Sequence, residues 1–78
     1  MKLEQTQEYH TQNLYEASFL LCSGFKLSGK EKDGAKVRIG FSGEGVRQAA
    51  LGYYNGGKVE AKAYSDAYRT LKDFIFER

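Results

Sequence analysis

The residues of this chain best suited to bind a ligand are cations that alternate with other residues on both sides of Asp33-Gly34. Side chains at every second position of a strand point to the same face. Two strands joined at Asp33-Gly34 would therefore gather these residues on one outer face: Lys26, Ser28, Lys30, Lys36 and Arg38. Four cations without an acid could lie along a phosphate backbone, which makes nucleic acid a candidate partner. The alternative is a solubilising role, because lysines on exposed strands discourage edge-to-edge aggregation.

Residue types that catalyse reactions or hold metals are sparse. His10 and Cys22 are the single histidine and the single cysteine, and a zinc site needs more ligands than these two. Cys22 falls on the apolar stripe of a helix that we expect to be buried, where a thiol is usually inert. Glu4 and Glu8 fall in a terminus that we expect to be flexible over residues 1–8, so they do not indicate acid–base catalysis. The sequence therefore predicts no enzyme, no cofactor and no metal.

Tyrosines form a second candidate site around the segment Asn55-Gly56-Gly57. We expect this segment to stop one helix before the next begins. Four tyrosines flank that joint: Tyr53, Tyr54, Tyr64 and Tyr68. Such a cluster could bind a base or a peptide, but tyrosines also commonly lie at the edge of a core with their hydroxyls in water.

The elements that would position these residues belong to one small α+β domain over residues 9–78. We expect a first, central helix capped by Thr11 and closed by Gly24, then the β-hairpin, then a helix over residues 43–54 capped by Ser42. A last helix begins at Glu60 or Lys62. The predicted order is α-β-β-α-α, with an antiparallel hairpin packed on three helices. Tyr9 to Thr11 as a short additional strand is left open.

The apolar residues of the hairpin predict its register. A three-residue loop, residues 32–34, would pair Leu27 with Ile39 and Gly29 with Val37 and place all apolar side chains on one face. A two-residue loop at Asp33-Gly34 would mix the two faces. We therefore expect the longer loop, with Gly34 in the left-handed conformation.

Motifs spread over residues 9–76 resemble a small bacterial and phage domain of unknown function, the family numbered 5659. The similarity rests on "YYNG" and on three other groups of residues: Thr11-x-Asn13-Leu14-Tyr15-x-Ala17-x-x-Leu20, Gly24-Phe25, and Ala63-Tyr64-x-x-Ala67-x-x-x-Leu71-Lys72. Asn13 and Ala61 depart from the family pattern, which more often has an acid and a proline there. Both positions begin helices, so the departures concern capping. The resemblance supports the fold and implies a bacterial or phage setting, but no activity.

The remaining features concern partners and location. A net charge of +2 excludes little, and no apolar run is long enough to span a bilayer, so we expect a cytoplasmic protein. Phe76 points away from the predicted stripe of the last helix, and with Tyr54 it is a candidate interface residue. The sequence thus predicts a non-catalytic binding module for a protein partner, with a homodimer among the options. The alternative is nucleic-acid binding by the hairpin.

Overall fold

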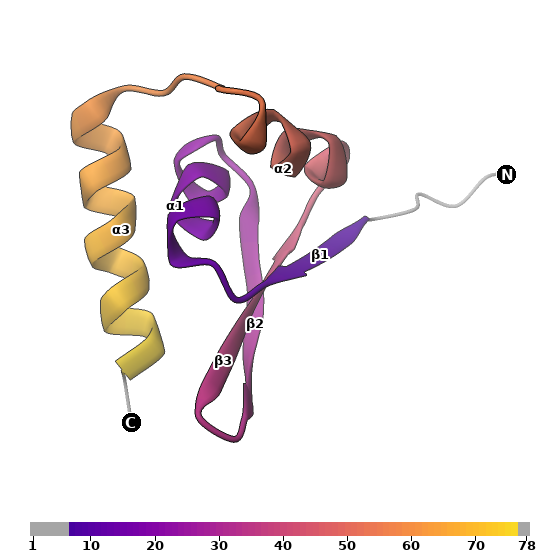
Figure 1. The fold of residues 1–78 in the computed structure, drawn as a ribbon, viewed down its shortest axis with the longest axis vertical. Helices are drawn as coiled ribbons and strands as arrows, with labels where there is room; N and C mark the ends of the chain where they lie inside the picture. The colour runs from indigo at the N-terminus through magenta and orange to yellow at the C-terminus, as the bar shows by residue number, and fades with distance from the viewer. Residues whose placement is uncertain (1–6, 77–78) are drawn as a thin grey trace, which may run out of the picture.

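The computed structural model describes residues 7–76 and shows a small α+β domain (Figure 1). Its elements are β1 (Glu8–Thr11), α1 (Leu14–Cys22), β2 (Lys26–Asp33), β3 (Lys36–Ser42), α2 (Val46–Tyr54) and α3 (Ala61–Phe76). Residues 1–6 of the predicted flexible terminus lie outside the described residues, whereas Glu8 already belongs to β1.

The sheet has three antiparallel strands in the order β1-β3-β2. The segment left open in the sequence is a strand: in β1, Tyr9 pairs with Phe41 and Thr11 pairs with Ile39. This pairing makes β3 the central strand. Ile39 and Phe41 therefore supply the buried surface of the sheet, at 1% and 0% exposure.

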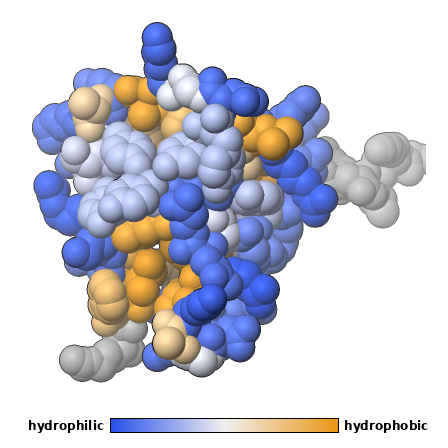
Figure 2. Space-filling model, viewed as in Figure 1, coloured by the Kyte–Doolittle hydropathy of each residue, from blue (hydrophilic) through white to orange (hydrophobic). Residues whose placement is uncertain are grey.

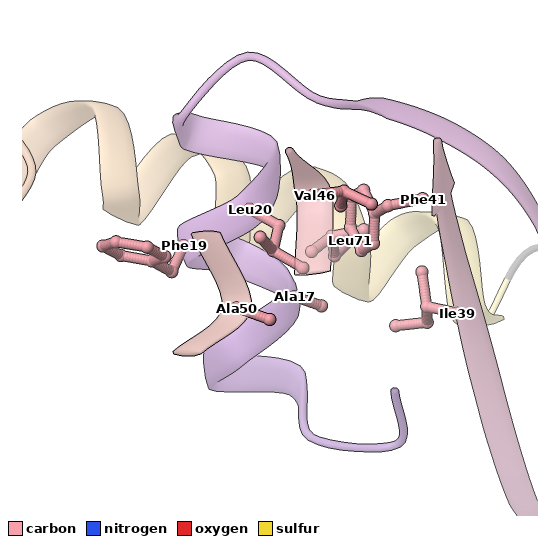
Figure 3. Close-up of a cluster of buried hydrophobic side chains, with 8 residues drawn as sticks. All are labelled: Ala17, Phe19, Leu20, Ile39, Phe41, Val46, Ala50 and Leu71. Atoms are coloured by element: carbon pink, nitrogen blue, oxygen red, sulfur yellow. The ribbon is translucent and has the colours of Figure 1, made fainter. Parts of the chain in front are cut away.

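The hydrophobic core lies where α1 meets the sheet, α2 and α3. Ala17 and Leu20 of α1 are fully buried there, and α1 buries the unbroken run of residues 16–20. By contrast, α2 and α3 bury two residues each. This confirms that the first helix is the most buried one. The cluster also contains Phe19 of α1 and side chains from β3, α2 and α3 (Figure 3): Ile39, Phe41, Val46, Ala50 and Leu71.

The predicted hairpin register is wrong. The strands are joined by the two residues Gly34-Ala35, because Asp33 already pairs with Lys36. Gly34 has a φ of +68° and no other residue type has positive φ in residues 7–76. Positive φ at the first central position of a two-residue loop is the pattern of a type II′ turn. The left-handed glycine was thus predicted correctly, but in a different loop.

A β-bulge accounts for the difference in register. Leu27 pairs with Phe41 and Gly29 pairs with Gly40, so Ser28 is an extra residue in β2. Leu27 keeps its predicted inward orientation. Beyond the bulge the faces of β2 are exchanged, because one extra residue reverses the alternation that follows it.

Both predicted N-caps are also wrong. Thr11 ends β1, and Asn13 caps α1 by accepting hydrogen bonds from the backbone N–H groups of Tyr15 and Glu16. Ser42 pairs with Glu8 and belongs to β3. The helix α2 therefore begins at Val46, after Gly45, and not at the predicted residue 43.

The glycine stop signals were predicted correctly. Gly24 and Gly56 follow α1 and α2 with φ of +102° and +83°. The next residue in each case donates its N–H back into the helix, from Phe25 to Leu20 and from Gly57 to Gly52. These bonds are those of Schellman motifs, which turn the chain sharply at both helix ends.

Candidate functional site

The predicted basic face of the hairpin is divided between the two sides of the sheet. After the bulge, Lys30 pairs with Ile39 and therefore points toward α3. Its ammonium group donates to the backbone carbonyl of Phe74 and lies 4.9 Å from the centre of the Phe74 ring. The prediction that Lys30 lies on the outer face with Arg38 is thus wrong.

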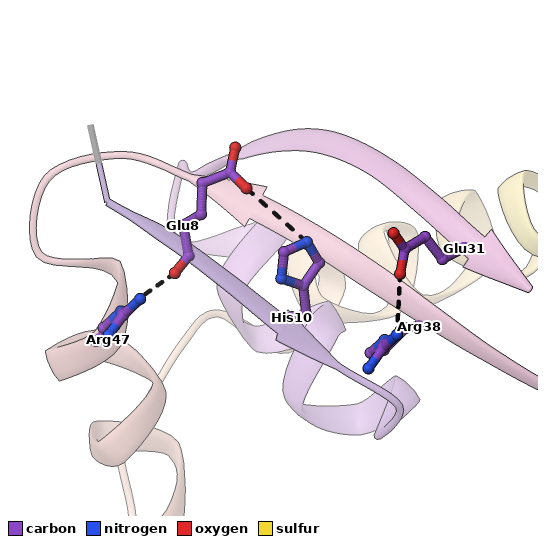
Figure 4. A network of polar contacts seen from close by, with 5 residues as sticks. All are labelled: Glu8, His10, Glu31, Arg38 and Arg47. Atoms are coloured by element: carbon purple, nitrogen blue, oxygen red, sulfur yellow. Dashed lines mark hydrogen bonds and ion pairs between the residues drawn. The ribbon is translucent and has the colours of Figure 1, made fainter. Parts of the chain in front are cut away.

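The outer face of the sheet carries both signs of charge (Figure 4). Arg38 donates to Glu31, with 2.9 Å between Nη2 and Oε1. Lys36 pairs across the strands with Asp33, and Lys26 pairs with Ser42. The predicted acid-free surface of four cations is therefore absent from the described hairpin, and Lys26, Lys36 and Arg38 remain on this face beside Glu31 and Asp33.

His10 and Ser28 lie together on the same outer face, over Gly40. A β-carbon on Gly40 would lie 2.6 Å from the Ser28 hydroxyl oxygen and 2.9 Å from the His10 ring. The His10 ring nitrogen is 3.9 Å from a carboxylate oxygen of Glu8, whose backbone carbonyl accepts a hydrogen bond from Arg47. A β-carbon at position 40 would therefore force the Ser28 or His10 side chain to shift.

A groove between α1 and α3 is lined by one exposed tyrosine, Tyr15, and by two half-buried ones, Tyr64 and Tyr68. Tyr64 and Tyr68 are four residues apart on α3, so they lie on the same side of that helix. Tyr15 of α1 stacks on Tyr68 with ring centres 5.7 Å apart and an interplanar angle of 18°. The Tyr64 hydroxyl donates to the backbone carbonyl of Tyr15 at 3.1 Å. Two helices thus build one aromatic wall.

The groove has a volume of about 490 Å³, and polar and cationic groups of α3 complete its lining, which comprises Tyr15, Tyr64, Ser65, Tyr68, Arg69 and Lys72. A second hollow of about 540 Å³ lies toward the α2–α3 connection and shares Tyr64 and Ser65 with the groove. Figure 2 shows pale, weakly hydrophilic side chains on this part of the surface, with both hydrophobic and strongly hydrophilic side chains around them.

The cations of the groove are held only loosely. The Lys72 ammonium lies 5.8 Å from the centre of the Tyr68 ring. Arg69 contacts Asp66 at 3.4 Å in a pair whose side chains are 72% and 49% exposed. Burial, followed by neighbouring tyrosines, raises the pKa of Tyr64 above its usual value. The groove is therefore a neutral aromatic surface edged by two accessible cations.

The predicted tyrosine cluster is only partly the observed one. Tyr64 and Tyr68 line the groove, but Tyr53 packs against Phe19 and Tyr54 on the α2 side. Tyr15, which sequence reasoning did not include, contributes the exposed wall at 56% exposure. Tyr15 lies one turn before Phe19 on a helix that is apolar on most sides. The sequence therefore did not indicate which of these residues face the core and which face solvent.

Sequence reasoning also missed a buried carboxylate, Glu16, which is 1% exposed. It accepts three hydroxyl hydrogen bonds: from Tyr9 at 2.7 Å, from Thr11 at 2.7 Å and from Tyr54 at 3.0 Å. Asn13-x-x-Glu16 has capping-box spacing, but that pattern predicts a side chain bonded to the N-cap backbone N–H and not a buried acceptor of hydroxyl groups. Burial and the adjacent carboxylate raise the pKa of Tyr9 to about 12.

Tyr54 and Phe76, the candidate interface residues, lie in different surroundings. Tyr54 is 59% exposed, but its hydroxyl belongs to the Glu16 network. Phe76 is 72% exposed at the end of α3, beside a hollow lined by Thr70, Asp73 and Phe74. Among residues 7–76, Tyr54 and Phe76 neither contact each other nor line the same hollow.

In residues 7–76 no group of three His, Cys, Asp or Glu side chains is placed to hold a metal ion, and Cys22 is half-buried. None of the three helices in this range has the length and apolar character needed to cross a membrane.

No family model, curated protein or solved structure matches the chain. The resemblance to family 5659 accordingly stays a prediction, and the case for function rests on the groove and the sheet.

Proposed function

We propose that this protein is a non-catalytic binding module that takes a segment of a partner protein into the groove between α1 and α3. The observation that carries the proposal is the tyrosine wall: Tyr15, Tyr64 and Tyr68 come from two helices, yet they line a single groove. Tyrosine offers a large, rigid and amphipathic contact surface, and it is enriched at protein interfaces.

The groove is organised before a partner arrives. Stacking of Tyr15 on Tyr68 and the hydrogen bond from Tyr64 to the Tyr15 backbone hold the rings in place. Ordering a mobile side chain on binding costs about 0.5–1.5 kcal/mol. Side chains that are already ordered before binding avoid this cost. Tyr15 nonetheless keeps more than half of its surface open to a partner.

Selection from a random peptide display library on the immobilised protein tests this proposal. We expect enriched peptides to compete with one another and to lose affinity for the Tyr15→Ala variant. Leu51→Ala is the matched control, because Leu51 is 61% exposed on α2 and lies outside the groove lining. Peptides that bind both variants equally, or a library without enrichment, would contradict the proposal.

Nucleic-acid binding by the outer face of the sheet is the second candidate. What supports it is the exposure of Lys26 and Lys36 beside Arg38. What weakens it is Glu31, which pairs with Arg38 and would repel phosphates. Salt-dependent retention on a mixed oligonucleotide pool, lost in the Lys26→Glu/Lys36→Glu variant, would favour this candidate over the groove.

A further inference from the structure

We infer that the segment bound by the α1–α3 groove is an extended, acidic and proline-containing stretch of another protein. This inference rests on the proposed function and adds the chemistry of the partner. Three features of the groove support it: the position of its cations, the aromatic character of its walls, and the composition of the chain itself.

The first feature is charge complementarity. Arg69 and Lys72 both line the groove and are three residues apart on α3, so they lie on neighbouring turns of the same side. Exposed ion pairs contribute little stability, and Arg69 can therefore exchange its contact with Asp66 for a carboxylate of a partner. Lys72 is positioned above the Tyr68 ring, at the edge of the aromatic wall. Carboxylates of a bound segment would meet both cations.

The second feature is the aromatic wall between these cations and α1. Proline-rich segments dock in aromatic-lined grooves because the polyproline II conformation is extended and already ordered before binding. A pyrrolidine ring placed against Tyr15 would bury apolar surface without any polar group to satisfy. Acidic residues next to that proline would then point toward Arg69 and Lys72.

The third feature concerns self-association. These 78 residues contain no proline, so a second copy of them cannot supply the proline that we infer.

Single-stranded nucleic acid fits the same groove less well. Aromatic side chains and cations are the usual components of such sites. Here, however, the Tyr68 ring already contacts both Tyr15 and Lys72, so a base that stacks on Tyr68 would have to displace one of these neighbours.

Fluorescence anisotropy with the full chain tests the inference. The main probe is a labelled peptide that repeats Glu-Pro over about ten residues, a length that spans the groove in an extended conformation. A Lys-Pro repeat of the same length is the charge-reversed probe, and an oligothymidylate of about ten nucleotides represents single-stranded nucleic acid. Of the three probes, we expect only the Glu-Pro peptide to show saturable binding.

Two variants with the same change in net charge localise the binding. Arg69→Glu/Lys72→Glu should weaken it by about tenfold or more, because attraction becomes repulsion at the groove. Lys32→Glu/Arg47→Glu should bind like the wild type, since neither residue lines the groove. Circular dichroism spectra of both variants check that the fold is kept.

Several outcomes would overturn the inference. These are no binding of the Glu-Pro peptide, equal binding of the Lys-Pro peptide, equal losses in the two variants, or preferred binding of the oligothymidylate. The proposed function can fail or survive separately. If the display library enriches neutral or basic peptides that depend on Tyr15, the groove binds protein segments and only the acidic class is wrong.

Discussion

Replacing Glu16 by alanine should remove the buried acceptor that joins β1, α1 and α2. Glu16 is 1% exposed and accepts hydroxyl groups from Tyr9, Thr11 and Tyr54. Without the carboxylate, the hydroxyl of Thr11 loses its acceptor in a buried position, and that of Tyr9 loses its acceptor in a half-buried one. Tyr54 is 59% exposed and can turn to water instead.

The magnitude follows from these three environments. A buried polar group left without its partner costs about 1–3 kcal/mol, which applies fully to Thr11 and partly to Tyr9. Loss of the buried methylene groups adds about 1 kcal/mol, while release from burying a charge offsets part of the sum. We therefore expect Glu16→Ala to lower the free energy of unfolding by about 2–4 kcal/mol, and the melting temperature by about 4–8 °C for each kcal/mol.

Urea denaturation followed by circular dichroism measures this change. Tyr64→Phe is the control, because the Tyr64 hydroxyl bonds an exposed backbone carbonyl and its loss should cost about 1 kcal/mol or less. A double-mutant cycle of Glu16→Ala with Tyr9→Phe should give a coupling of about 1 kcal/mol or more. A Glu16→Ala variant within about 0.5 kcal/mol of the wild type, or one without coupling to Tyr9, would refute the reasoning.

Three further changes have defined outcomes. Because burial and Glu16 raise the pKa of Tyr9 from 10.0 to about 12, the folded state holds this proton more tightly than the unfolded state. The contribution of Tyr9 to stability should be constant below pH 10 and decline from pH 10 to 12. Urea midpoints measured across that range should therefore decline less steeply for Tyr9→Phe than for the wild type. Equal slopes would contradict the raised pKa of Tyr9. Gly34→Val should destabilise the protein by about 1–2 kcal/mol, because no atom crowds the site but a β-branched residue fits its φ of +68° poorly. An unchanged melting temperature would argue against the left-handed turn. Phe76→Glu should reduce any self-association seen by sedimentation across a concentration series, because Phe76 is 72% exposed. A wild type that stays monomeric throughout would remove the homodimer prediction.

Local patterns predicted the elements better than they predicted the contacts between them. Alternation fixed residues 26–41 as two strands, and Gly24 and Gly56 marked the helix ends, because these signals depend only on neighbouring residues. The pairing of the two strands could not be predicted in this way, because alternation within each strand does not determine how one strand is aligned with the other. The extra residue Ser28 let Leu27 face the core while turning Lys30 toward α3. A bulge of this kind is set by packing across the whole domain.

The candidate site shows the same limit. Tyr64 and Tyr68 were expected near one another because they share a helix face. Tyr15 joined them only through the packing of α1 on α3, which brings together residues far apart in the sequence. Glu16 looked like an ordinary polar position in an apolar helix. Its three hydroxyl partners come from β1 and α2, so no pattern within α1 could have indicated that it is buried.

The pairing of β1 with β3 has a consequence for how the chain folds during its synthesis. β1 leaves the ribosome first, but its partner strand emerges only after α1 and β2, so β1 stays unpaired until most of the sheet is made. Glu16 then gains Tyr9 and Thr11 early and Tyr54 last, because Tyr54 ends α2. A nascent chain that stops before α2 would hold Glu16 with an incomplete set of hydroxyl donors. Completion of the buried network therefore requires the synthesis of α2.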